Sequence, residues 1–266
     1  MAVKNNAITI LTLFGGRWHT LEPFLHGLLN LDWPIKNLRL LWYTNAGEQF
    51  VECLKMQKAL LEKKGYRIDL VQDASLPPSA LISQEGGQRT NEHLYTIAAL
   101  YNAAWQHVET DDVLALEDDV LPPSHAVRRL FKVMKGTPQA AVVLSCVFDR
   151  HTAGTVVAWD VVQTPVFGGP AENPIAFKYV ALQVEKPWGV RKISAGGLSC
   201  TLIRRSRMPA QMRRQHPFKV WNTIPGQEPF SGCDIVFGME INQYGKEVYA
   251  DFDVRPLHID SKARIH

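Results

Sequence analysis

The chain has 266 residues, of which 46% are hydrophobic and 21% are charged. This length and composition suit one large α/β domain or two small ones and argue against an intrinsically disordered protein. The net charge of +3, from 29 basic and 26 acidic side chains, does not indicate a nucleic-acid-binding protein. The four cysteines include no CxxC pair, and reduced thiols are typical of a cytoplasmic protein.

Strands and helices alternate in the first half of the chain. The apolar run from Ile8 to Leu13 is too short to span a membrane and lacks the cleavage site of a signal peptide, so it predicts a first strand. Thr20, followed by Pro23, predicts a helix start with a hydroxyl cap. Further strands are predicted at 38–43, 66–71, 112–116 and 140–144, and further helices at about 47–64, at about 90–108 and after Pro122-Pro123. This alternation indicates a mainly parallel sheet with right-handed crossovers.

The second half of the chain is less regular. Residues 146–190 are rich in glycine, proline and aromatic residues, and such segments are often functional loops or small sheet insertions. Beyond them we predict a glycine-interrupted strand at 193–202, a helix at 231–244 and short strands at 247–250 and 254–258. Since no repeat or linker is evident, we predict one domain, residues 1–266. It would have a nucleotide-binding half to about residue 130 and an acceptor-binding half from about residue 131.

Three acidic residues, Glu117, Asp118 and Asp119, directly follow the predicted strand 112–116. Ligands of open α/β sheets bind beyond the carboxyl ends of the strands. Adjacent carboxylates repel one another unless a cation compensates, and hard divalent ions prefer oxygen ligands that also bridge to phosphate. The triplet therefore indicates a metal site, with a solvated loop that caps the next helix as the alternative.

Three other segments carry polar groups that chemistry could use. Arg89-Thr90-Asn91 opens a predicted helix, where an arginine and backbone amides would meet a diphosphate or where Thr90 simply caps the helix. Asp234 heads the helix at 231–244 and is a candidate general base or a helix cap. His258 follows a short strand and is a candidate metal ligand, although an isolated histidine is more often structural.

In this order the features resemble the glycosyltransferase-A fold families, in particular inverting, family-2-like glycosyltransferases that use nucleotide sugars. In those families an arginine–asparagine pair opens the helix before a strand that ends in a DxD-type acidic motif. A glycine-containing strand, an acidic residue before a helix with an aromatic three positions on, and a late histidine then follow. The corresponding residues here are Arg89-Thr90-Asn91, Glu117-Asp118-Asp119, Ala195-Gly196-Gly197, Asp234-Ile235-Val236-Phe237 and His258.

The sequence departs from the pattern of these families at two places. The acidic element is EDD rather than a literal DxD, and in families with such a triplet the last carboxylate binds the metal, which here is Asp119. The usual glutamate–aspartate pair before the second helix is Cys233-Asp234, so one carboxylate remains in the position of the base.

The resemblance implies a Rossmann-like α/β fold with a mainly parallel sheet between helices and a small second sheet in the C-terminal half. It also implies Mn²⁺ or Mg²⁺ held by Asp119, His258 and Glu117, and the histidine nitrogen favours manganese. Asp234 would deprotonate an acceptor hydroxyl, and the sugar would be transferred with inversion from a nucleoside-diphosphate sugar, with UDP expected. Donor-binding residues would be Thr12, Phe14, Gly15, Arg17, Thr44, Asn45, Arg89, Asn91, Glu117, Asp118, Gly196 and Gly197.

Other interpretations stay open at this stage. Gly15-Gly16-Arg17 also resembles the sugar-phosphate nucleotidylyltransferases, although residues 18–24 lack the lysine of those enzymes. The cysteine before Asp234 leaves a non-catalytic nucleotide-binding scaffold possible. Arg204-Arg205-Ser206-Arg207 and Arg213-Arg214 form either a solvated helix face or a peripheral contact with an anionic membrane. The acceptor, whether a saccharide, a lipid-linked saccharide or a protein, would be selected by residues 146–190.

Overall fold

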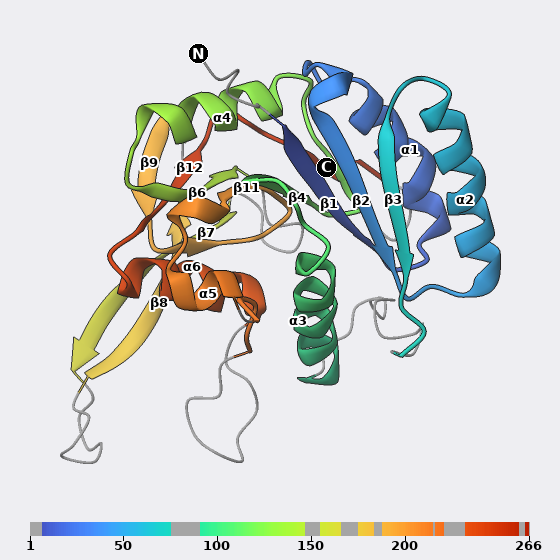
Figure 1. The fold of residues 1–266 in the computed structure, drawn as a ribbon. Coiled ribbons are helices and arrows are strands. Elements are labelled where there is room, and N and C mark those ends of the chain that lie inside the picture. Colours follow the sequence, from blue (N-terminus) through green and yellow to red (C-terminus); the bar gives the residue numbers. More distant parts are fainter. Residues whose placement is uncertain are drawn as a thin grey trace.

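The computed structural model describes residues 7–75, 91–146, 155–165, 175–183, 188–214, 216–220, 232–260 and 264–265. Its centre is an eight-stranded sheet with helices on both faces (Figure 1). In spatial order the strands are β3 (Arg67–Gln72), β2 (Leu38–Thr44), β1 (Ile8–Phe14), β4 (Asp112–Leu116), β11 (Cys200–Arg204), β6 (Ala140–Ser145), β12 (Glu247–Asp251) and β9 (Val190–Ile193). The α-helices are α1 (Trp18–Leu29), α2 (Glu48–Glu62), α3 (Asn91–Trp105), α4 (Ala126–Gly136), α5 (Ala210–Arg214) and α6 (Cys233–Gln243).

Residues of the strands pack alternately into two hydrophobic clusters, one on each face of the sheet. Ile8 and Ile10 of β1 pack in a cluster with α1, α2 and α4, whereas Leu11 and Leu13 pack in a cluster with α3, α5 and α6. Side chains of a strand point alternately to opposite faces, so a sheet covered on both faces needs apolar residues at nearly every position. This requirement explains why β1, β4 and β6 are buried along their whole length.

The direction of the strands changes across the sheet. β3, β2, β1 and β4 are parallel to one another. β11 runs antiparallel to both β4 and β6, while β12 is parallel to β6 and antiparallel to β9. The predicted strand 193–202 is therefore three separate strands, β9, β10 (Ala195–Gly196) and β11. The central sheet is mainly parallel and flanked by helices, which confirms the predicted fold class.

Two smaller ladders accompany the central sheet. β10 forms an antiparallel sheet with β7 (Thr155–Pro165) and β8 (Ile175–Gln183), and the β7–β8 pair extends away from the central sheet in Figure 1. This confirms the small second sheet predicted for the C-terminal half. The other ladder joins β5 (Val120–Leu121) to β13 (Leu257–His258).

The predicted starts of two helices are wrong by a few residues. α1 begins at Trp18, and the Thr20 hydroxyl lies inside its first turn, where it donates to the Arg17 carbonyl. α4 begins at Ala126 rather than at the two prolines, because a turn comes first, in which the Ala126 amide donates to the Pro123 carbonyl at 2.9 Å. Among the helices of the described residues, none combines the length and apolarity that crossing a bilayer requires.

The basic segment at 204–207 is not the solvated helix face that the sequence suggested. Arg204 ends β11 and forms an ion pair with Asp112 at 2.7 Å, and Arg205 donates to the Val108 carbonyl at 2.7 Å. Nη1 of Arg207 lies 2.7–2.9 Å from three backbone carbonyl oxygens around the end of α4, those of Met134, Thr137 and Ala140. These arginines hold neighbouring elements together because they satisfy buried acceptors, whereas Arg213 is exposed.

Candidate active site

The acidic triplet lies at the carboxyl end of β4, in the middle of the central sheet. The Glu117 amide donates to the Ser199 carbonyl at 3.0 Å, which ties this end to the turn before β11. Asp118 and Asp119 are only 0% and 3% exposed, and Glu117 is half-buried. A solvated loop does not bury two carboxylates, so that alternative is wrong for Asp118 and Asp119.

The pairing of β5 with β13 places His258 beside the acidic triplet. His258 lies opposite Val120 in this ladder, and the next amide, that of Ile259, donates to the Asp119 carbonyl at 2.8 Å. As a result, Nδ1 of His258 lies 4.0 Å from Oδ2 of Asp119.

Glu117, Asp119 and His258 each offer one ligand atom, and these atoms lie within 4.8 Å of one another. Two carboxylates and an imidazole are a donor set that suits Mn²⁺ and also accommodates Mg²⁺. The residues that the sequence proposed as metal ligands therefore stand close enough together to share one ion.

Arg17 reaches the same carboxylates from the loop between β1 and α1. Its Nη1 lies 2.5 Å from Oδ2 of Asp119, and its Nη2 pairs with Oδ1 of Asp118. The Gly15 amide donates to Oδ2 of Asp118 at 3.2 Å, and Gly16 turns the chain with a φ of +82°, a region that favours glycine. The loop is thus fixed to Asp118 and Asp119 at both ends of a short turn.

The charges of this cluster depend on one another. Burial by itself lowers the pKa of Arg17, but the carboxylates of Asp118 and Asp119 outweigh it and hold that pKa above its ordinary value. Burial raises the pKa of Asp118, and Arg17 opposes this rise while Asp119 adds to it. Arg17 therefore stays charged and stabilises the ionised forms of its two partners.

Several of the predicted donor-binding residues have side chains inside the protein. Thr12, Phe14 and Thr44 are 0% exposed and Asn45 is 2% exposed. The Phe14 ring packs against other aromatic rings of the core, and the Thr44 hydroxyl donates to the Phe14 carbonyl at 2.9 Å. The Phe14 ring is thus part of the core, and the Thr44 hydroxyl joins the end of β2 to the end of β1. Arg89 lies outside the described residues, and for Asn91 only the backbone, which begins α3, is described.

Asp234 is in the first turn of α6, the helix that packs against β10. A Cβ placed on Gly238 of α6 would lie 2.9 Å from the Ala195 Cα, so glycine permits this close approach. The Phe237 ring stacks on Phe218 at 5.0 Å, on the buried side of the helix. The predicted Gly196 pairs with Ala158 in the small sheet, which places the glycine segment and Asp234 on touching elements.

Tyr101 of α3 links the acidic triplet with the start of α6. Its ring lies 5.0 Å from that of Phe218. Burial raises the pKa of Tyr101 well above its ordinary value, and the negative charges of Glu117 and Asp234 add to the rise. Both carboxylates therefore act electrostatically on one phenol, although they are distant in sequence.

The sequence patterns singled out neither Tyr101 nor Trp18 as a site residue. Trp18 directly follows Arg17, is 55% exposed and packs edge-on against Phe50 with ring centroids 5.0 Å apart. The signal available in the sequence was a tryptophan directly after Gly15-Gly16-Arg17, and only the structure shows that its ring is unusually exposed for a large aromatic side chain.

No family model matches the sequence, and no curated protein matches it. The structure is similar to that of the mannosyltransferase PcManGT from Pyrobaculum calidifontis, solved in complex with GDP-Man and Mn²⁺. The identity is 14% and the TM-score 0.55, over 94% of this chain and 55% of that one. It is also similar to TarS 1-349 of S. aureus, at 10% identity and a TM-score of 0.52, over 94% of this chain and 59% of that one.

These similarities define the class of fold. The chain spans a little over half the length of the two proteins that it matches. It has a glycosyltransferase-A type of fold, which confirms the fold family that the order of the motifs predicted. At such low identity the similarity concerns the fold, and the activity must be argued from the site.

Proposed function

We propose that the protein is a metal-dependent glycosyltransferase that moves a sugar from a nucleoside-diphosphate sugar, with UDP as the expected nucleotide, to an acceptor hydroxyl. The observation that carries the proposal is the convergence of Glu117, Asp119 and His258 at the carboxyl end of β4. In open α/β sheets this is the edge where ligands bind. The similarity to a mannosyltransferase that was solved with GDP-Man and Mn²⁺ supports the proposal.

Each part of the site has a role in this proposal. Asp119, His258 and Glu117 would hold Mn²⁺ or Mg²⁺, which supplies positive charge to a diphosphate leaving group. The loop of Gly15 and Arg17 binds the donor beside it, and charged hydrogen bonds of arginine suit phosphate oxygens. Asp234 accepts the proton of the acceptor hydroxyl, whose oxygen then attacks the anomeric carbon with inversion.

The acceptor side of the proposal rests on the small sheet. β10 connects β7 and β8 with the elements around Asp234, so an acceptor bound along this sheet would reach the proposed base. We place the protein in the cytoplasm, with at most peripheral membrane contact. The thiols of Cys53, Cys146 and Cys200 are not in disulfides, as a reducing compartment would require.

A ligand screen tests the proposal. A ligand that binds only the folded state adds about 2.7 kcal/mol of stability at a hundred times its Kd, which raises the Tm of a domain of this size by roughly 5 °C or more. We expect such a rise with a nucleoside diphosphate or nucleotide sugar that depends on Mn²⁺. Asp119→Ala should lose the metal-dependent part, whereas Asp32→Ala, at an exposed ion pair with Arg128, should keep it.

Transfer itself distinguishes the proposal from its rivals. Asp234→Asn should keep the metal-dependent rise in Tm and lose donor hydrolysis and transfer, since the proton acceptor is removed but the donor site is not. Full activity of Asp234→Asn would contradict the role of Asp234. Release of pyrophosphate from a nucleoside triphosphate and a sugar phosphate would instead establish a nucleotidylyltransferase. The absence of any metal-dependent shift across the screen would refute the proposed function.

A further inference from the structure

Arg17 bridges two buried carboxylates with two different nitrogens of one guanidinium. The side chains of Asp118 and Asp119 are only 1% and 4% exposed, so water cannot compensate their charges. The Oδ2 atom of Asp119 that accepts from Arg17 also lies 4.0 Å from Nδ1 of His258. The guanidinium therefore contacts the side of Asp119 that faces another proposed ligand of the metal.

A divalent ion held by Glu117, Asp119 and His258 would share the Asp119 carboxylate with this guanidinium. Two positive charges on one carboxylate repel each other strongly at a partly buried site, because water screens them less there. The Arg17 side chain is 21% exposed, so part of it borders solvent. A phosphate group would offer it new charged acceptors of suitable geometry.

We infer that Arg17 is a built-in counter-cation that occupies Asp119 until a divalent ion binds, and that it then moves to the diphosphate of the donor. This inference rests on the proposed function and adds a regulatory step to it. The metal ion binds weakly on its own because it must displace Arg17. It binds tightly together with a diphosphate, because the displaced arginine gains a partner. Coupling of this kind is reciprocal, so the metal ion also strengthens diphosphate binding.

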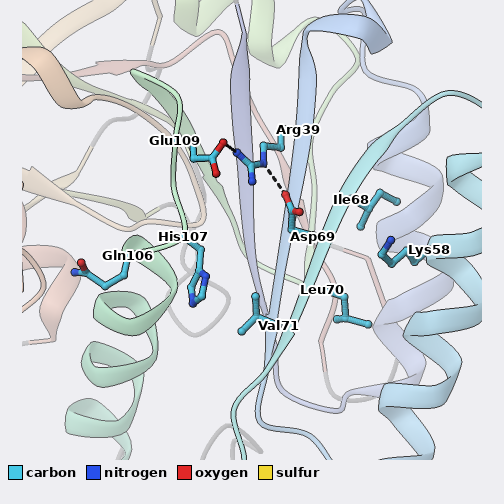
Figure 2. Close-up of a pocket in the computed structure, with 9 residues that line it drawn as sticks. All are labelled: Arg39, Lys58, Ile68, Asp69, Leu70, Val71, Gln106, His107 and Glu109. Atoms are coloured by element: carbon cyan, nitrogen blue, oxygen red, sulfur yellow. Dashed lines mark hydrogen bonds and ion pairs between the residues drawn. The ribbon is translucent and has the colours of Figure 1, made fainter.

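The molecule contains a matched control for Arg17. Arg39 also bridges two carboxylates, with its Nε 2.6 Å from Asp69 and its Nη1 paired with Glu109, in a pocket at the β3 edge (Figure 2). Its side chain is 24% exposed, close to the value for Arg17, but its partners are 45% and 75% exposed and lie among different elements. Removing the charge of Arg39 therefore changes the net charge by the same amount as removing that of Arg17, and it does not affect contacts of the proposed metal ligands.

The test is Mn²⁺ binding to the purified protein without nucleotide, followed by the loss of the free-ion signal in electron paramagnetic resonance. Arg17→Gln should bind Mn²⁺ at least about tenfold more tightly than the wild type, since the competing charge is gone. Arg17→Lys, which keeps the charge, and Arg39→Gln should both stay within about threefold of the wild type. Equal affinity of Arg17→Gln and wild type would overturn the inference and leave the proposed function intact. Binding by no variant, even with diphosphate, would overturn both.

Saturating UDP or GDP tests the second half of the inference. The gain in Mn²⁺ affinity on adding diphosphate should be larger for wild type than for Arg17→Gln, because only the wild type has an arginine to relocate. Equal gains would overturn the move to the diphosphate. If Arg17→Gln needs the metal ion to fold, refolding in the presence of Mn²⁺ but not in NaCl of equal ionic strength would support the inference. Absence of such rescue would count against it.

Discussion

At the scale of single residues, the carboxylate of Asp234 occupies space that a side chain at position 232 would fill, and residue 232 is a glycine. Gly232 and Gly47 are the residues that precede α6 and α2, and their backbones are almost the same, with φ/ψ of −67°/163° and −63°/160°. A Cβ on Gly232 would lie 2.7 Å from Oδ1 of Asp234, whereas a Cβ on Gly47 would have no atom within 4 Å. Any residue tolerates these angles, so the two positions differ only in what the side chain would meet.

Gly232→Ala should therefore displace the Asp234 carboxylate and leave the fold intact. We expect a fall in kcat of about tenfold to a hundredfold, because a misplacement of about 1 Å in a reacting group has effects of this size. The control Gly47→Ala bears the same modest cost of alanine at a helix cap, up to roughly 1 kcal/mol, with no change in kcat. Steady-state kinetics of both variants measure kcat, and urea unfolding measures their free energy of unfolding. Equal kcat values for the two variants would argue against Asp234 as the base.

At the scale of elements, α6 is held against the small sheet by backbone contact rather than by side chains alone. A Cβ on Gly238 would meet the Ala195 Cα at 2.9 Å and the Ser194 carbonyl oxygen at 3.2 Å. Asn242, one turn later on the same face, donates to that Ser194 carbonyl at 2.7 Å. The close approach of α6 to β10 positions Asp234, and backbone atoms cannot move aside as a side chain does.

Gly238→Ala should lower the free energy of unfolding by about 1–3 kcal/mol, the usual cost of overpacking, although alanine is the better helix former. Gly136 near the end of α4 has no atom within 4 Å of an added Cβ, so Gly136→Ala should be neutral or slightly stabilising. Urea denaturation of both variants measures the difference. If Gly238→Ala were as stable as Gly136→Ala, the contact between α6 and β10 would not be close in solution.

At the scale of the whole molecule, the two hydrophobic clusters share one sheet and should unfold together. Cys200 belongs to the cluster of α1, α2 and α4, and Cys146 belongs to the opposite cluster. Burial raises the pKa of the Cys146 thiol to about 11 and that of the Cys200 thiol to about 12. Since the thiolate is the reactive form, we expect both thiols to react slowly at pH 8 in the folded protein.

Unfolding returns both thiols to their ordinary pKa of about 8.5, so a substantial fraction becomes thiolate at pH 8. Iodoacetamide labelling in a urea series, read by mass spectrometry, should therefore modify Cys146 and Cys200 at the same urea midpoint. Half-buried Cys53 of α2 provides an internal comparison and should react at lower urea. Modification of Cys146 well before Cys200 would show that the two faces of the sheet unfold separately.

The sequence alone determined the type and order of most elements and the place of the acidic triplet. The apolar runs of β1, β4 and β6 and the spacing within α3 follow from local geometry, because side-chain direction repeats every two residues in a strand and every 3.6 in a helix. The carboxylates follow β4 directly, so their position at its carboxyl end needed only that strand to be recognised. Helix starts were less predictable, because a turn after Pro122-Pro123 delays α4 to Ala126.

Only the tertiary structure decided how the site is assembled. Arg17 contacts Asp118 and Asp119 across 101 and 102 residues of sequence, and β13 brings His258 to Asp119. The antiparallel insertion of β11 between β4 and β6, and the arginines that hold it, also depend on such distant contacts. Local patterns specify which way a side chain points, but the partner it meets depends on how the whole chain closes around its two hydrophobic clusters.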